Sequence, residues 1–262
     1  MSQLKIWGRL SSINVKKAVW TAQELGLDFE HHEAGGVHGV VKTPAYIALN
    51  PNSQIPVMED GDYVLWESNV ITRYLCAKYG APTLVASHNA LDVLTPEALA
   101  LRAVQTRASG LGAAALSPKW AVPSLGRPGA SANSPGNFYP EDLQERFDAE
   151  RWMEWQQTMI NPASRNGFWH LIRLPLDQRD PALIAQSNAQ VELLMAMLDA
   201  HLANRIFMVG ERFTMADIPL GCEVHRWFGL PQTREKRPHI ERWFAALLAR
   251  PATAGVLDLA LV

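Results

Sequence analysis

Short apolar runs alternate with helix-like segments over the first eighty residues of the chain. Residues 4–7 and 28–33 have the length and composition of β-strands. Between them, residues 15–25 place apolar side chains at helical spacing and end at Gly26, a residue typical of helix C-termini. This order predicts a strand–helix–strand unit. Residues 44–49 then fit a short helix.

A second pattern follows, in which two short apolar runs flank a tight turn. Residues 57–59 and 63–66 lie on either side of Gly61 and predict a β-hairpin. Pro56 stands where the hairpin begins, because proline cannot donate a hydrogen bond within a sheet. Residues 69–79 then have the apolar spacing of an amphipathic helix. Together these elements predict an α+β domain over residues 1–81.

Beyond residue 81 the pattern becomes helical. Four segments have helical apolar spacing and a fifth resembles a helix, which predicts an all-α domain over residues 82–262. The four are residues 149–160, 181–203, 215–228 and 240–249, and the fifth is residues 96–115.

An insertion at about residues 90–145 interrupts this helical pattern. Residues 117–140 are rich in Pro, Gly, Ser and Asn, which predicts a loop. Loops of this length are usually functional lids or disordered segments. As a lid, the loop would pack Trp120, Phe138 and Tyr139 over a cleft; as a disordered segment, it would pack against nothing.

The composition excludes several classes of protein. The chain has 262 residues, 48% of them apolar, with nine Trp and a net charge of −2, so it can build sizeable cores and does not favour a nucleic-acid partner. We expect no membrane span and no signal peptide. Two Cys far apart in sequence predict neither a disulfide framework nor a zinc site, and a reduced, cytoplasmic setting is the simplest inference. We therefore expect no metal.

The stretch from Asn50 to Ser68 combines features that can hold an extended peptide. A cis bond before Pro56 would leave the N–H and C=O of Ile55 facing solvent, where an extended peptide can pair with them as an extra strand. The helix start after Ser68 favours a carboxylate, and Glu67 could take an ammonium group. A thiol-bearing extended peptide with both charges on one end is glutathione. Alternatively, each feature is only a turn or a helix cap.

Three segments together resemble the cytosolic glutathione S-transferases. They are Leu4-Lys-Ile-Trp7 with residues 11–20, the stretch just described, and Phe213-Thr-Met-Ala-Asp217, which is similar to the family's capping box. The resemblance implies a thioredoxin-like N-terminal domain over residues 1–81, a helical-bundle domain over residues 82–262, and a homodimer. The pattern of Ser12 and Asn14 looks closest to the serine-type theta and bacterial nu-like branches.

The resemblance also implies roles for single residues. Ser12 would donate a hydrogen bond to the sulfur of glutathione, with Asn14 as an auxiliary amide; Ser11 is the alternative donor, and a helix N-cap is the structural alternative for Ser12. Within the glutathione site, Gln54 would reach the glycyl carboxylate, and His38 and Lys42 are weaker candidates. Ile55, Pro56, Glu67 and Ser68 complete the expected glutathione site, in the roles described above.

Other residues have structural interpretations. Thr214 and Asp217 are expected to cap a helix, so that their loss harms folding rather than chemistry. The Trp-rich residues 152–155 could line an acceptor pocket, although aromatic side chains at helical spacing more often belong to a core. No Cys or Tyr occupies the loop around Ser12, which argues against chemistry through an enzyme cysteine.

Two classes of function are therefore expected. In the first, an enzyme of detoxification activates the thiolate of glutathione, its co-substrate, for attack on an apolar electrophile or a disulfide in a cleft between the domains. Dehalogenation, ether cleavage, isomerisation and peroxide reduction are all open. In the second, the chain is a non-catalytic module of the same fold that binds a ligand or partner.

Overall fold

The computed structural model describes residues 4–80 and 137–262, which belong to one compact unit. Its four-stranded sheet has the order β2-β1-β3-β4. The strands are β1 (Leu4–Trp7), β2 (Glu30–His32), β3 (Val57–Asp60) and β4 (Tyr63–Trp66). β1 pairs parallel with β2 and antiparallel with β3, and β3 and β4 form the predicted hairpin. The peptide bond before Pro56 is cis.

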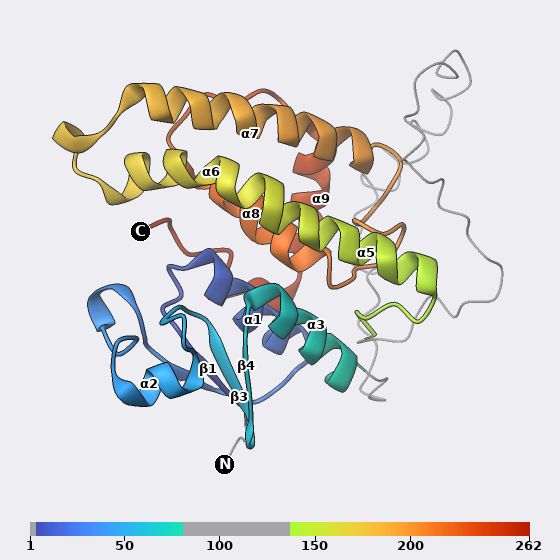
Figure 1. The fold of residues 1–262 in the computed structure, drawn as a ribbon. Helices are drawn as coiled ribbons and strands as arrows, with labels where there is room; N and C mark the ends of the chain where they lie inside the picture. The colour runs from blue at the N-terminus through green and yellow to red at the C-terminus, as the bar shows by residue number, and fades with distance from the viewer. Residues whose placement is uncertain (1–3, 81–136) are drawn as a thin grey trace. The chain divides into compact units, whose positions relative to one another are not determined.

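Three helices pack with this sheet: α1 (Ile13–Glu24), α2 (Pro44–Leu49) and α3 (Ser68–Tyr79). α1 and α3 contact one another (Figure 1). Apolar side chains from α1 and β1, such as Val15 and Ile6, are fully buried with Met58 of β3. This arrangement is the thioredoxin-like fold that the alternation of short strands and helices predicted.

The remaining described residues are mainly helical. They are α5 (Leu143–Trp155), α6 (Asn161–Phe168), α7 (Pro181–Leu202), α8 (Asp217–Gly229) and α9 (Pro238–Leu248). α8 contacts α1, α5, α6 and α9, and nearly all of its residues are buried. α8 therefore joins the sheet domain to the helical one (Figure 1). None of the helices in the described ranges has the length and apolar character that crossing a membrane demands.

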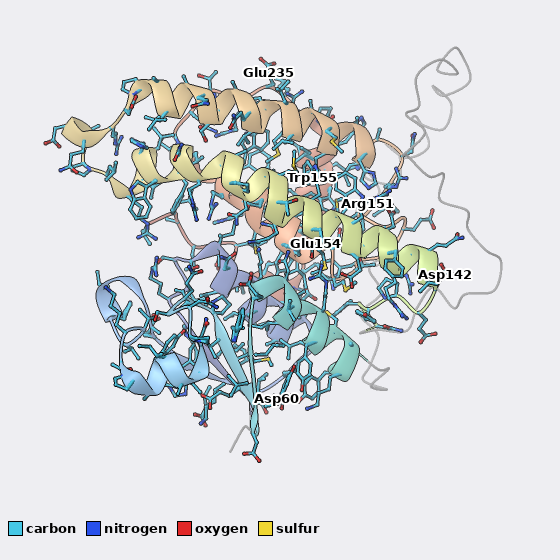
Figure 2. The ribbon with its side chains drawn as sticks, in the orientation of Figure 1. Asp60, Asp142, Arg151, Glu154, Trp155 and Glu235 are labelled. Carbon is cyan, nitrogen blue, oxygen red and sulfur yellow. The ribbon has the colours of Figure 1, made fainter. Side chains whose placement is uncertain are left out.

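The sequence patterns located the ends of most of these elements to within two residues, but the predicted start of one helix was wrong. The segment predicted at residues 149–160 begins earlier, at Leu143. Asp142, labelled in Figure 2, accepts hydrogen bonds from the main-chain N–H groups of Gln144 (3.0 Å) and Glu145 (3.1 Å), and so starts the helix. The chain then stays helical to residue 173, through π-helical turns at Gln156–Ile160 and Trp169–Arg173 on either side of α6.

The suggestion that Phe138 covers a cleft was also wrong. Phe138 is 8% exposed and packs edge-on against Phe213 in the core, with ring centroids 5.1 Å apart. Its carbonyl accepts a hydrogen bond from Met215 N at 2.9 Å, which fixes this segment against the start of α8. Tyr139 is partly buried against the same core. Trp120 and the helix expected at residues 96–115 lie outside the described residues.

Asp217 has the structural role that the capping motif predicted. Its carboxylate is fully buried and accepts hydrogen bonds from Met208 N (2.9 Å), Trp243 Nε1 (2.8 Å) and both the N–H (2.8 Å) and hydroxyl (3.3 Å) of Thr214. Burial raises the pKa of Asp217 to about 6, and these hydrogen bonds act in the opposite direction. The carboxylate therefore ties the start of α8 to the preceding loop and to α9.

Candidate functional site

The loop between β1 and α1 brings the chain close to the segment before β3. Gly8 has a φ of 141°, and a Cβ at this position would lie 2.4 Å from Val15 Cγ2 and 3.1 Å from Ile55 Cβ. Only glycine fits both this backbone conformation and this contact. The close approach places the start of α1 beside Ile55.

Ser12 occupies the N-cap position of α1, but its side chain makes no capping hydrogen bond. Its main chain is held, because its N–H donates to Arg9 O and its carbonyl accepts from Lys16 N, both at 3.0 Å. The first turn of α1 contains no acidic residue whose negative charge would offset the positive potential of the helix N-terminus. The hydroxyl is thus half-buried at the positive end of a helix and is not used as a cap.

The neighbours of Ser12 lie at two different cavities. Ser11 lines the larger cavity, and its Oγ accepts a hydrogen bond from Arg173 at 3.4 Å. Asn14 lines the smaller one, and its buried Oδ1 has no hydrogen-bond partner within the described ranges. Ser12 stands between them in the chain and lines neither cavity.

The smaller cavity, of about 100 Å³, gathers most of the residues that were predicted to bind glutathione. Ile55 and Pro56 line it from the sheet side, and Glu67 and Ser68 from the start of α3. The remaining lining residues are Asn14, Asn50, Asn52, Gln54 and Gln157. Its lining is predominantly polar, which suits a charged and hydrogen-bonding ligand.

The main chain of Ile55 is open for pairing. Over residues 4–80 and 137–262, no hydrogen bond engages its N–H or its C=O. The preceding carbonyl, that of Gln54, is fixed by the Tyr46 hydroxyl (2.9 Å) and Asn50 Nδ2 (3.0 Å). Asn50 Oδ1 in turn accepts from Asn52 N at 3.0 Å. The loop is therefore rigid up to Gln54 and presents an unpaired peptide group after it.

Glu67 and Ser68 lie together at the N-terminus of α3. Glu67 has a φ of 73°, a left-handed conformation that is costly for a residue other than glycine. Its side chain is exposed, whereas Ser68 is only 4% exposed. Strain of this kind concentrates at ligand sites. An acid and a hydroxyl next to free helix N–H groups match the two charges of an amino-acid end.

Sequence reasoning missed Lys17, whose ammonium lies beneath this cavity. Lys17 is fully buried and donates to Gln156 Oε1 (2.8 Å), Gln157 Oε1 (3.4 Å) and Ser68 Oγ (3.4 Å). Burial lowers the pKa of Lys17 to about 8, while the negative charge of Glu223 opposes that shift. The only signal in the sequence was a Lys pair on an otherwise apolar helix.

The charge on Lys17 belongs to a buried network that reaches α8. Gln156 Nε2 donates to Glu223 Oε1 at 2.8 Å, and Ser164 Oγ donates to Glu223 Oε2 at 3.3 Å. Arg226 lies 3.7 Å from the same carboxylate. Burial lowers the pKa of Arg226. The smaller cavity is thus supported from below by two cations and one carboxylate.

The larger cavity, of about 470 Å³, takes its lining from both halves of the described chain. Arg9, Leu10, Ser11, Glu33 and residues 36–38 come from the sheet domain, and Trp169, Arg173 and Val262 from the other. His38 therefore lies at this cavity and not at the smaller one, and it pairs with Glu33 at 3.4 Å. Lys42 is exposed and lines neither cavity.

The suggestion that residues 152–155 line an acceptor pocket is not supported. Trp152 is 2% exposed and packs edge-on against Trp155, with centroids 5.1 Å apart; Trp155 is labelled on α5 in Figure 2. The aromatic residue at the larger cavity is Trp169 instead. It was missed because the helix that carries it was not predicted.

Neither cysteine is placed for chemistry. Cys76 and Cys222 are buried free thiols, and burial raises the pKa of Cys222 to about 12. Within the described ranges, no three His, Cys, Asp or Glu side chains cluster as metal ligands. Because the thiolate is the nucleophilic form, neither cysteine is suited to act as a nucleophile.

Comparison with known proteins identifies the family. A model of the glutathione S-transferase N-terminal domain matches residues 2–77, and one of the glutathione S-transferase C-terminal domain matches residues 153–251. Glutathione S-transferase GstB of Escherichia coli is 30% identical over 97% of each chain, and glutathione S-transferase 3 of Zea mays is 27% identical over 96% of this chain and 92% of its own. The theta class glutathione S-transferase of Xanthomonas axonopodis pv. citri, solved with glutathione bound, is 35% identical over the full length of both chains, with a TM-score of 0.76. The chain therefore belongs to the glutathione S-transferase family.

Proposed function

We propose that this glutathione S-transferase is of the serine type and activates the thiol of glutathione with the hydroxyl of Ser12. The observation that carries the proposal is the position of Ser12. Its hydroxyl stands at the N-terminus of α1 without a capping hydrogen bond, and its neighbours Ser11 and Asn14 line the two cavities. A sulfur bound here would lie between the site for glutathione and the site for its reaction partner.

The chemistry needs a thiolate, and a free thiol with a pKa of about 8.5 is mostly protonated at neutral pH. Lowering that pKa by about two units requires roughly 2.7 kcal/mol of preference for the anion. A hydrogen bond to a charged acceptor contributes about 1.5–3 kcal/mol, and a helix N-terminus about 0.3–1 kcal/mol more. The buried ammonium of Lys17 adds positive potential from the same helix.

The smaller cavity supports one pose for glutathione. In this pose, the γ-glutamyl end of glutathione lies at Glu67 and Ser68, and the main chain of glutathione pairs with the open N–H and C=O of Ile55. Gln54 reaches the glycyl carboxylate; the exposed Lys42, which lines neither cavity, is the weaker candidate for that role. The glutathione complex of the Xanthomonas relative supports glutathione as the ligand.

In the reaction, the sulfur forms a bond to an electrophilic carbon and the leaving group departs with its bonding electrons. The proton of the thiol passes to solvent. The larger cavity, which both domains line, receives the apolar second substrate. The relatives that this chain resembles are glutathione S-transferases, which favours the enzyme over the alternative of a non-catalytic module.

We further infer a cytoplasmic homodimer. Membership of the family supports both points, and closed two-fold symmetry is the commonest oligomeric arrangement. Analytical ultracentrifugation at micromolar concentration should give the mass of two chains, and a single species of one chain would contradict the dimer.

The role of Ser12 is tested by titrating the thiolate absorbance of bound glutathione in three variants, Ser12→Ala, Ser11→Ala and Asn14→Ala. Ser12→Ala should raise the pKa of the bound thiol and lower turnover roughly 10–1000-fold, the scale of losing one electrostatic donor. Glutathione affinity should change little. Ser11→Ala is the matched control. If Ser11→Ala alone raises that pKa, the donor is Ser11, and if Asn14→Ala alone does so, the sulfur is held by the amide.

A further inference from the structure

Two guanidinium groups border the larger cavity. Arg9 comes from the loop between β1 and α1, and Arg173 from the π-helical turn that follows α6. Burial lowers the pKa of Arg173, and the positive charge of Arg9 lowers it further. The two groups therefore lie close enough to act together on whatever enters the cavity.

Neither arginine has an acidic partner among the described residues. Arg173 donates a hydrogen bond to the neutral Ser11 Oγ at 3.4 Å, and its guanidinium lies over the Phe168 ring, 5.4 Å from the centroid. The acidic side chain in the lining, Glu33, lies 3.4 Å from His38, with which it forms an ion pair when that imidazole is protonated. Partly buried cations without a counter-ion are costly, and they form a favourable site for an anion. Guanidinium groups suit carboxylates because they can form paired hydrogen bonds.

The rest of the lining is apolar and open to a ligand. Leu10, Val37, Trp169 and Val262 contribute apolar surface. Val37 is 96% exposed and Trp169 is 51% exposed, so neither side chain is committed to the core. A volume of about 470 Å³ is within the range of pockets for small molecules. The cavity thus combines a flat apolar wall with a concentration of positive charge.

We propose that the second substrate is an aromatic electrophile that carries a carboxylate, held by Arg9 and Arg173 with its body against Trp169. This assignment rests on the proposed function, because it places the electrophile beside the sulfur. The hydrogen bond from Arg173 to Ser11 sets the carboxylate one residue from Ser12. The sulfur forms the new bond to carbon, the leaving group departs with the electron pair, and the carboxylate is unchanged.

The test compares two benzylic halides that differ in charge at one position, 4-(bromomethyl)benzoate and 4-(bromomethyl)benzamide. Both present the same electrophilic carbon and nearly the same volume. The readout is the ratio of kcat/KM for the benzoate to that for the benzamide at saturating glutathione, after subtraction of the uncatalysed rate. The parent should favour the benzoate about tenfold or more, the scale of one charged contact. Added salt should lower this ratio.

Arg173→Gln and Arg9→Gln should each lower the ratio about tenfold. Arg165→Gln is the matched control, because it removes an exposed arginine from α6 that does not line the cavity; its ratio should equal that of the parent. An unchanged ratio in both cavity variants overturns the assignment. So does an equal loss on both substrates with a raised KM for glutathione, which would place the arginines on the glycyl carboxylate of glutathione.

The acceptor assignment and the proposed function can be refuted separately. If the parent conjugates the benzamide as well as it does the benzoate, the acceptor assignment fails and the proposed function stands. If it turns over neither compound, the acceptor assignment is overturned, and titration of the bound thiol in Ser12→Ala then decides the proposed function on its own.

Discussion

Removing the buried carboxylate of Asp217 should destabilise the fold without changing the chemistry. In Asp217→Ala, the N–H groups of Met208, Thr214 and Trp243 lose an acceptor that lies 2.8–2.9 Å away in the parent. An unsatisfied buried donor costs about 1–3 kcal/mol. Because water can enter the cavity and relieve part of this cost, we expect a loss of about 3–6 kcal/mol in the free energy of unfolding, a large share of a typical total.

The pH dependence gives a sharper test through Asp217→Asn. Burial raises the pKa of this carboxyl from about 4 to about 6 in the folded protein, so the folded state holds a proton that the unfolded state has lost. The stability that this proton supplies is fully present below pH 4 and is lost as pH rises through 6. The shift corresponds to about 3 kcal/mol. Asparagine does not titrate, so its deficit relative to the parent should be larger at pH 4 than at pH 7.

Urea unfolding of the parent and both variants at pH 4, 5, 6 and 7 measures these differences. At low urea, the rate of glutathione turnover per folded molecule should be the same in both variants as in the parent. A deficit of Asp217→Asn that grows from pH 4 to pH 7 would refute the reasoning, because it would show that the hydrogen bonds outweigh burial and hold the carboxylate ionised. A loss of turnover in fully folded Asp217→Asn would refute its purely structural role.

Three further predictions concern the smaller cavity. Glu67→Ala should weaken glutathione binding by roughly 1.5–3 kcal/mol, the value of a charged hydrogen bond, and calorimetry should show no such loss in Asp62→Ala, which removes another exposed acid. Burial lowers the pKa of Lys17 to about 8, so the folded state favours the neutral amine, and the stability that this contributes is present above pH 10.5 and is lost as pH falls through 8. Between pH 8 and pH 10.5, the free energy of unfolding of the parent, measured with urea, should rise by up to about 3 kcal/mol relative to Lys17→Met. If the two free energies run parallel with pH, the buried charge is contradicted. Asn50→Ala frees the loop before Ile55 and should raise the KM for glutathione more than it lowers kcat; a change in kcat alone would count against the proposed pose.

The parts of the site that could be predicted are those that lie next to each other in the chain. Ile55, Pro56, Glu67 and Ser68 share one cavity because a hairpin of fixed length connects them. Pro56 marks the strand start, since no other position in a sheet tolerates it. Local backbone rules were therefore sufficient to bring together the residues of the smaller cavity.

The larger cavity could not be predicted, because its residues meet only through tertiary packing. Arg9 and Arg173 are distant in sequence, and the helix between Asn161 and Phe168 contains Pro162 and Gly167, both unusual inside a helix. Pro162 is the second residue of α6 and directly follows a π-helical turn, where the main-chain hydrogen-bond pattern is already irregular. Gly167 lets α7 approach, since a Cβ there would lie 2.9 Å from Ser187 Oγ.

The two π-helical turns on either side of α6 give this part of the molecule an uneven tolerance to changes of length. A π turn accommodates one more residue than an α turn, and each residue of a helix corresponds to a rotation of about 100°. Deleting one residue from Gln156–Ile160 can therefore convert that turn to an α turn while the later side chains keep their direction. Deleting one residue from the start of α6 has no such compensation, and it would rotate the later side chains, moving Gly167 away from Ser187 and Arg173 away from Ser11. Relatives should therefore differ in length at the π-helical turns more often than within α6.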